Sequence, residues 1–331
     1  MTKKKAVGLS AVIIICLLMP LMITSRYWQN VLIMSLIFVL LSTSWNVAVG
    51  FAGVFTFGHA GFFAIGAYGG ALMTTRLGVS PWVGLLTGIV AAGLLAFVVG
   101  LVCLRVRGIY LSILTICISE IIYFTAGEWR SLTHGAQGVL GIPRPVIDLP
   151  LLPKLVLNSE LSYYYFLLVL LGFTIYFIYR YRNSRIGRAL LGISEDMNMA
   201  RSLGINVFWY QMAAFCISCM LAALAGSTYA YYMGIVVPEV GSVHYMVQAS
   251  AMVMAGGAGT IGGPIVGGIV LGILPETLRI AGAFRLIFFG AVVLICIMLL
   301  PRGIYPPLKS AFMSVSKRMG RFSAQHAKTF G

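Results

Sequence analysis

Residues 179–206 read YRYRNSRIGRALLGISEDMNMARSLGIN, a polar stretch between two long apolar halves of the chain. Apolar residues recur in it at three- and four-residue spacing, which predicts a short amphipathic helix: Ile186, Ala189, Leu190 and Ile193. A second short helix is predicted from Glu195 to about Leu203, with Ser194 as its N-cap and Gly204 as its left-handed end. The same stretch holds a basic run: Arg180, Arg182, Arg185 and Arg188. We expect a helical hairpin that faces water and contacts another protein.

Composition indicates a membrane protein. Hydrophobic residues make up 60% of the chain and charged residues 9%, and the mean hydropathy is +0.97. In soluble domains, charged residues are about a quarter. The formal net charge of +15 does not indicate nucleic-acid binding, because the basic residues cluster between apolar runs, as topology signals do. The cysteines fall inside apolar runs, where we expect them to pack as small hydrophobic residues.

The apolar runs predict an all-α, polytopic integral membrane protein of about ten transmembrane helices. Lys3–Lys5 precede the first run and no small-residue cleavage site follows it, so we expect an uncleaved first helix. The expected spans cover about residues 7–24, 31–49, 60–75, 82–104, 109–126, 161–179, 207–232, 245–255, 263–280 and 284–300.

Basic residues predict the orientation. With both termini and residues 180–206 in the cytoplasm, about sixteen of the 23 lysines and arginines lie inside and about seven outside. The loop at 127–160 then lies in the periplasm. Residues 1–305 form the transmembrane domain, and residues 306–331 form a basic cytoplasmic tail that we expect to contact anionic membrane lipid.

Glycines are too frequent in residues 46–70 for an ordinary helix. Gly50, Gly53 and Gly58 each weaken a helix by about 1 kcal/mol relative to alanine, which predicts a broken or re-entrant segment. Such segments are typical of transport paths. Close helix packing is the alternative, since Gly66 and Gly70 have the spacing that lets helices approach. His59 fits either a packed, hydrogen-bonded histidine or a ligand-binding one.

A second glycine-rich stretch, MVMAGGAGTIGGPIVGG at residues 252–268, has the same character in the C-terminal half. Two such interruptions in comparable halves are typical of a duplicated transporter core.

Glu120 lies inside the fifth predicted span. A carboxylate at the bilayer centre costs about 2.5 to 3.5 kcal/mol unless it faces the bundle interior. It either lines the path or makes a structural hydrogen bond to a neighbouring helix.

The chain carries no motif for ATP hydrolysis or for hydrolase chemistry. A P-loop needs glycine directly before its lysine, and no lysine here has that neighbour. The sequence also lacks H-E-x-x-H and G-x-S-x-G. We expect a transport protein, not an enzyme, that takes its energy from a partner.

Short motifs follow one another in a fixed order over about residues 30–305: Asn46, Gly50, Gly53, Gly58-His59 and Phe62–Tyr68; Leu104–Tyr110 with Thr115 and Glu120; Gly187–Leu190; Leu203–Asn206; Ala214-Phe215; Gly256–Thr260 with Gly263-Pro264; and Pro301–Gly303. Their order and spacing resemble the permease subunits of branched-chain amino acid ABC importers, of the LivM type in the LivH/LivM family.

The resemblance implies a permease of the bacterial inner membrane with four kinds of partner or ligand. These are a homologous LivH-type permease that forms a heterodimer with it, two LivG/LivF-type ATPase subunits, a periplasmic substrate-binding protein, and branched-chain or other hydrophobic amino acids as substrate. ATP would bind to the ATPases, so no cofactor or metal is expected on this chain. Urea or short amides are the alternative substrates, and a stand-alone secondary transporter or channel is the alternative class.

The resemblance also implies two sets of site residues. The ATPase-coupling residues would be Gly187, Arg188, Glu195, Ala200 and Gly204. The resemblance, together with the glycine breaks and the position of Glu120, implies a translocation path. Its residues would be Gly53, Gly58, His59, Thr115, Glu120, Gly257 and Gly259.

Two places depart from the family's pattern. In the counterpart of the E-A-A-x-x-x-G loop, Ala200 and Gly204 match, but Asn198 and Met199 stand where Glu and Ala are expected, which leaves open which ATPase the loop engages. Thr133-His134-Gly135 resembles part of a T-G-G-x-x-G motif, with His134 in place of a glycine. That change leaves the transported molecule open.

Overall fold

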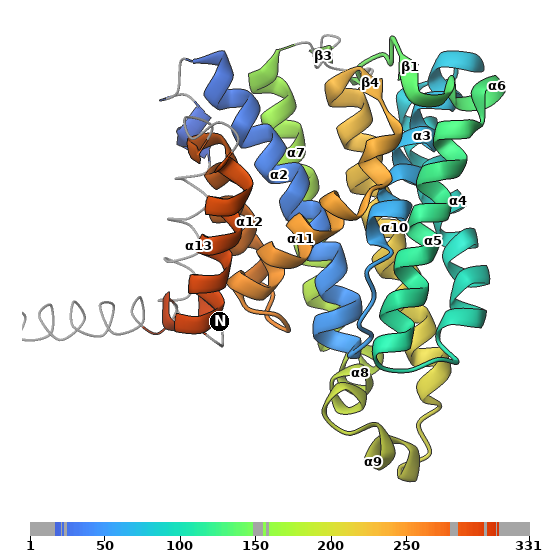
Figure 1. The fold of residues 1–331 in the computed structure, drawn as a ribbon, viewed down its shortest axis with the longest axis vertical. Coiled ribbons are helices and arrows are strands. Elements are labelled where there is room, and N and C mark those ends of the chain that lie inside the picture. The colour runs from blue at the N-terminus through green and yellow to red at the C-terminus, as the bar shows by residue number, and fades with distance from the viewer. Residues whose placement is uncertain are drawn as a thin grey trace, which may run out of the picture.

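The chain folds into a bundle of helices with a short helical hairpin projecting from one end (Figure 1). The computed structural model describes residues 17–20, 22, 25–147, 155–156, 159–278, 284–300, 303–308 and 310. Helices dominate these residues, which confirms the predicted all-α membrane fold. The first predicted span and the predicted tail lie largely outside the described residues.

Long apolar helices form the frame of the bundle. Within the described residues, five stretches are long and apolar enough to cross a membrane: Arg26–Phe51, Pro81–Cys103, Ile109–Glu128, Glu160–Asn183 and Val207–Met233. The first joins α2 (Arg26–Asn46) to the π-helical turn η1 (Val47–Phe51), and the others are α4, α5, α7 and α10. Shorter helices complete the bundle: α3 (His59–Arg76), α11 (Val243–Gly256), α12 (Gly263–Thr277) and α13 (Arg285–Leu299). Each of these helices overlaps one predicted span.

The first glycine-rich stretch breaks a span, as predicted. After η1, residues 53–58 have no helical structure, and α3 begins only at His59. Figure 1 shows α2 running to the hairpin end, the chain returning as an extended segment, and α3 starting near mid-height of the bundle. Gly53 has φ +66°, a left-handed conformation that favours glycine and lets the chain reverse here.

A second broken span precedes α11. After α10, the strand β4 (Ile235–Val236) and the 3₁₀ turn η3 (Pro238–Gly241) descend from the opposite end, and α11 starts near mid-height (Figure 1). The glycine-rich stretch at 252–268 interrupts the helices as predicted, but as the tight turn between α11 and α12. In the C-terminal half, the extended segment therefore comes before the glycine-rich stretch.

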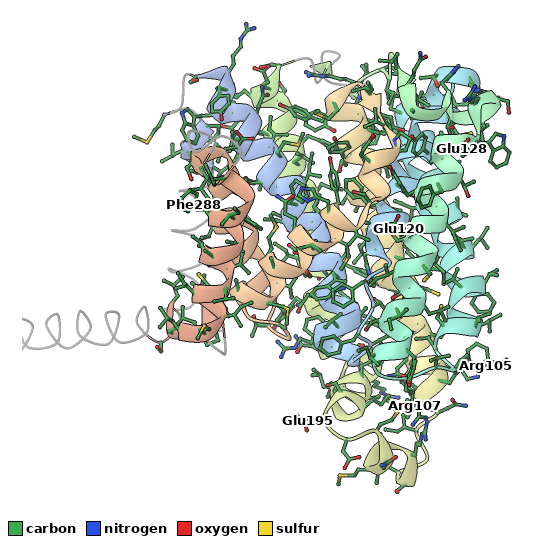
Figure 2. All side chains as sticks on the ribbon, viewed as in Figure 1. Arg105, Arg107, Glu120, Glu128, Glu195 and Phe288 are labelled. Carbon is green, nitrogen blue, oxygen red and sulfur yellow. The ribbon has the colours of Figure 1, made fainter. Side chains whose placement is uncertain are left out.

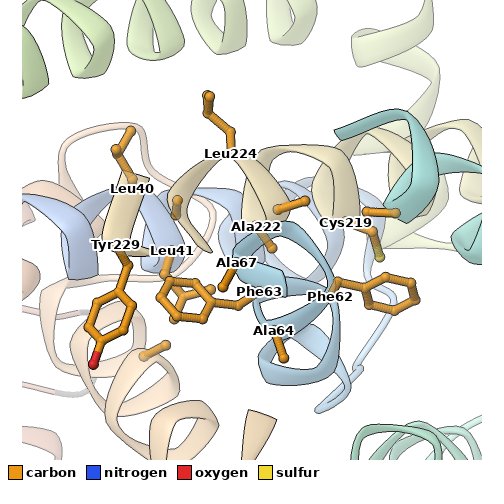
Figure 3. Close-up of a cluster of buried hydrophobic side chains, with 14 of the residues drawn as sticks. Leu40, Leu41, Phe62, Phe63, Ala64, Ala67, Cys219, Ala222, Leu224 and Tyr229 are labelled. Atoms are coloured by element: carbon orange, nitrogen blue, oxygen red, sulfur yellow. The ribbon is translucent and has the colours of Figure 1, made fainter. Parts of the chain in front are cut away.

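The centre of the bundle is a close packing of α3, α4 and α10. A Cβ on Gly226 of α10 would lie 2.7 Å from the Phe63 carbonyl carbon, and one on Gly88 of α4 would lie 2.9 Å from Gly66 O. Small residues thus let these backbones touch, so the packing interpretation of Gly66 holds together with the break. Figure 3 shows Phe62 and Phe63 of α3 among the buried side chains of this cluster, which include Cys219, Ala222 and Tyr229 of α10.

The end of the bundle opposite the hairpin carries short elements (Figure 1). α6 (Arg130–Thr133) and the 3₁₀ turn η2 (Gly135–Gln137) follow α5. β1 (Val139–Leu140) pairs antiparallel with β4, and β2 (Val146–Ile147) pairs with β3 (Leu155–Val156). All of these elements except β4 belong to the loop predicted at 127–160.

Candidate functional site

The hairpin consists of α8 (Arg185–Glu195) and α9 (Met197–Ser202). Ser184 caps α8, because its Oγ accepts a hydrogen bond from Gly187 N at 3.1 Å. Asp196 caps α9, accepting from Asn198 N at 2.8 Å and Met199 N at 3.0 Å. The predicted N-cap at Ser194 is therefore wrong: burial of Ile193 keeps α8 helical through Glu195, and the aspartate after it takes the capping role. The predicted left-handed end at Gly204 is confirmed, with φ +79°.

The hairpin is anchored to the bundle by its inner face. Leu190, Ile193 and Ala200 are buried, at 0%, 2% and 4% exposure. Gly187 is buried too, and a Cβ there would lie 2.5 Å from the Arg182 carbonyl carbon at the end of α7. Gly187 thus allows the sharp turn from α7 into α8.

The predicted coupling residues fall into two groups. Arg188, Glu195 and Gly204 are exposed, and Figure 2 shows Glu195 at the projecting end. Arg188 Nη1 also donates to Asn183 O at 2.8 Å, so it holds the last turn of α7. Gly187 and Ala200 pack inward instead. A bulky residue at Ala200 would therefore disturb the hairpin itself before it reached a partner.

Two apolar side chains point outward from the hairpin tip. Met199 is 66% exposed and Leu203 is 73% exposed. Both side chains are therefore available for contact with another protein. In the sequence, Met199 was noted only as a departure from the family pattern. The structure shows that Met199 is exposed at the hairpin tip, whereas Ala200, which matches the pattern, is buried.

The extended segment 53–58 lies between the hairpin and α5. Ser112 Oγ of α5 donates to Phe55 O at 3.0 Å, and Phe57 N donates to Thr115 Oγ1 at 3.0 Å. A Cβ on Gly58 would lie 2.8 Å from Thr115 O. The structure thus brings Gly58 and Thr115, two of the predicted path residues, into direct contact.

His59 is a packed histidine. It is 0% exposed, and its Nδ1 and Nε2 lie 3.2 Å from Thr56 Oγ1 and 2.5 Å from Ser218 Oγ. Ser218 Oγ donates to Ser44 O at 2.7 Å, so it accepts from Nε2, and Nδ1 accepts from Thr56. These bonds tie the start of α3 to α2 and α10. A direct role for His59 in the path stays a prediction.

The turn between α11 and α12 docks on the end of α2. Asn46 Nδ2 donates to Thr260 O at 2.8 Å, and Gly259 N donates to Asn46 Oδ1 at 2.9 Å. A Cβ on Gly50 would lie 2.5 Å from Gly259 N. The two glycine-rich stretches therefore meet, and Gly257 and Gly259, both at positive φ, shape the turn that Asn46 holds. Asn46 was noted in the sequence only as part of the family's motifs, and an asparagine in an apolar run does not predict which backbone groups its amide will bond.

Glu120 lies midway along α5, between Glu128 at one end and Arg105 and Arg107 beyond the other (Figure 2). Its side chain is half-buried. Among the residues that the structure describes, it has neither a hydrogen-bond nor an ion-pair partner. The nearby hydroxyls of α5 do have partners: Ser119 Oγ donates to Gly241 O of η3 at 3.0 Å. Its role in the path stays a prediction.

The backbone at His134 shows how a histidine can stand where the family pattern has a glycine. It has φ +61°, and it is the one non-glycine residue with positive φ in the described part of the chain. Glycine takes this conformation without strain, and histidine is among the side chains that tolerate it. The backbone therefore keeps the geometry of a glycine position.

These features define a class of polytopic α-helical membrane protein. Two broken spans contact α5, and a hairpin presents apolar side chains at one end of the bundle. Residues 27–299 match the family described as "Branched-chain amino acid transport system / permease component". The chain belongs to this family and is a permease subunit, which confirms the resemblance seen in the motifs.

Two similar proteins are named as permeases of branched-chain amino acid transport systems. The high-affinity branched-chain amino acid transport system permease protein LivM of Salmonella typhimurium is 28% identical over 327 residues, which cover 92% of this chain and 76% of that protein. LivH of Escherichia coli K12 is 32% identical over 139 residues, 41% of this chain and 44% of that protein. A solved chain from PsaBC of Streptococcus pneumoniae in complex with Fab aligns with a TM-score of 0.45 and 16% identity, over 86% of this chain and 96% of that one.

Proposed function

We propose that this chain is one of two homologous permeases in a binding-protein-dependent ABC importer of the bacterial inner membrane. With its sister permease it forms the path for branched-chain or other hydrophobic amino acids. Two separate ATPase subunits supply the energy, and a periplasmic binding protein delivers the substrate. Family membership and the names of the relatives support the substrate class.

One observation carries the coupling role. The α8–α9 hairpin is anchored inward by Leu190, Ile193 and Ala200 and exposes Met199 and Leu203 at its tip. A projection with a rigid base and an apolar tip fits insertion into a cleft of another protein. The excess of basic residues on the hairpin's side of the membrane supports a cytoplasmic position for it and for both termini. The ATP site then lies on the partner, because the lysines of this chain lack a P-loop context.

The test is uptake into proteoliposomes that hold this chain, its sister permease, the ATPases and the binding protein. We expect ATP-dependent accumulation of labelled leucine that stops when this chain is left out. Accumulation of labelled urea in place of leucine would favour the alternative substrate. Uptake that proceeds without ATP would contradict the proposal and favour a secondary transporter or channel.

A further inference from the structure

Ser194, an exposed residue in the last turn of α8, touches Gly53, the first residue of the extended segment. A Cβ on Gly53 would lie 3.2 Å from Ser194 Cα and 3.3 Å from Ser194 Cβ, so the backbone of segment 53–58 rests on the last turn of α8. Gln211 Nε2 of α10 donates to Ala52 O at 3.3 Å, just before this contact. A displacement of α8 toward the bundle therefore meets the segment first at Gly53.

The segment is held straight along its length. Val54 N donates to Ala48 O at 3.0 Å, and Trp45 Nε1 donates to Thr56 O at 2.5 Å. Val54 and Thr56 are buried, at 2% and 0% exposure, whereas Phe55 is 49% exposed. The alternation is that of an extended strand with one face against the protein. A chain pinned at successive residues transmits a push along its length and does not buckle.

The far end of the segment is bonded to α5. Phe55 O accepts from Ser112 Oγ, and Phe57 N donates to Thr115 Oγ1, each at 3.0 Å. Thr115 is 1% exposed, so its hydroxyl has no water to replace Phe57 as a partner. The hydroxyls occupy one stripe of α5, because positions three residues apart lie on the same helix face.

α5 depends on this stripe for its position. Its buried residues are Leu111, Thr115, Ser119 and Ala126, which recur at intervals of four, four and seven residues along one side. Only 22% of the apolar 18-residue stretch of α5 is buried inside the chain, compared with 56% of the corresponding stretch of α10. The hydroxyls on this side of α5 contact segment 53–58 through Ser112 and Thr115 and η3 through Ser119, so the segment is one of the contacts that position the helix. Glu120 lies next to the stripe and moves with it.

We propose that segment 53–58 is the strut that moves α5 in step with the α8–α9 hairpin, with Ser194 on Gly53 as the input contact and Ser112 and Thr115 as the positioning residues at the output. The inference rests on the proposed function, because it concerns how work done by the ATPase at the hairpin reaches the helix that carries Glu120. Neither hydroxyl needs to touch the substrate for this role.

The test compares Thr115→Val with Thr174→Val in the complete importer. Both threonines are buried, at 1% and 2% exposure, and both hydroxyls donate to their own helix. Thr115 also accepts from the strut, so the pair isolates that one bond. The measurement is leucine taken up per ATP hydrolysed, together with co-purification of the ATPase. Loss of one coupling contact changes coupling by roughly two- to thirtyfold.

We expect Thr115→Val to lower uptake per ATP within that range while the ATPase still co-purifies and hydrolyses ATP. Thr115→Ser, which keeps the hydroxyl, should restore the ratio, and Thr174→Val should match the wild-type chain. Equal ratios for Thr115→Val and Thr174→Val would overturn the inference, as would a Thr115→Ser variant as poor as Thr115→Val, since packing would then explain the loss.

A second variant covers the case in which Thr115→Val does not assemble. Ser112→Ala removes the bond to Phe55 O at a less buried position, and an unchanged uptake per ATP in that variant would overturn the inference. The wild-type complex separates the two proposals. No ATP-driven uptake by the wild type would overturn the proposed function and the strut with it, whereas normal wild-type uptake with an unaffected Thr115→Val would overturn the strut alone.

Discussion

Replacing Met199 and Leu203 together by serine should weaken ATPase binding without unfolding the permease. Both side chains lie at the hairpin tip, 66% and 73% exposed, and neither supports the inward anchor made by Leu190 and Ile193. The two serines therefore leave the fold of the hairpin intact and remove its apolar contact surface.

The magnitude follows from the exposed fractions. Full burial of a methionine or leucine side chain contributes about 1.5 to 3 kcal/mol. Two thirds to three quarters of each side chain is free to be covered by a partner, which gives roughly 1 to 2 kcal/mol per residue and roughly 2 to 4 kcal/mol for the pair. At about 1.4 kcal/mol per tenfold, the Kd should rise by roughly thirty- to several-hundredfold.

The assay is titration of the purified ATPase against the detergent-solubilised permease pair. Arg201→Ser is the matched control on α9, because it is also exposed and its charge is screened by water. The control should change the Kd by less than about fivefold. An unchanged Kd for the double variant would refute the idea that the hairpin tip is the docking surface.

Three further predictions concern the breaks and the opposite end. Asn46→Leu should lower the free energy of unfolding by roughly 2 to 4 kcal/mol in thermal denaturation, because it leaves Gly259 N and Thr260 O without partners. The control Ser35→Ala loses a bond only within its own helix and should lower the free energy of unfolding by less than about 1.5 kcal/mol. Equal losses in the two variants would contradict the amide contact. His134→Val should melt lower than His134→Gly, by about 1 kcal/mol or more, since a β-branched residue is strained at φ +61°; identical melting of the two would argue against strain at this position. Glu120→Gln should lower leucine uptake while the complex still assembles, whereas normal uptake by both Glu120→Gln and Glu120→Leu would remove this carboxylate from the path.

Local patterns were enough to predict the elements that neighbouring residues determine. The amphipathic spacing around Leu190 predicted α8, and the glycines at 50, 53 and 58 predicted the break before α3. Both rest on rules that act within a few residues, namely helical periodicity and the backbone freedom of glycine. The left-handed end at Gly204 is of the same kind.

Contacts between distant parts of the chain could not be predicted. Asn46 bonds Thr260 across 214 residues, and Ser112 bonds Phe55 across 57. A hydroxyl or amide inside an apolar run shows only that it needs a partner, and any backbone group brought near can supply one. The inward orientation of Ala200 had the same cause, because its burial comes from packing against distant parts of the chain and not from its neighbours in sequence.

The position of the hairpin tip relative to the membrane and the ATPase tests the central claim most directly. The measurement is labelling of Leu203→Cys by a membrane-impermeant maleimide, in a chain that also carries Cys117→Ser, because Cys117 is the exposed cysteine among the residues that the structure describes. The account predicts labelling in inside-out vesicles stripped of the ATPase, none in intact spheroplasts, and protection when the purified ATPase is added back. Labelling from the outside, or labelling that the ATPase does not block, would contradict it.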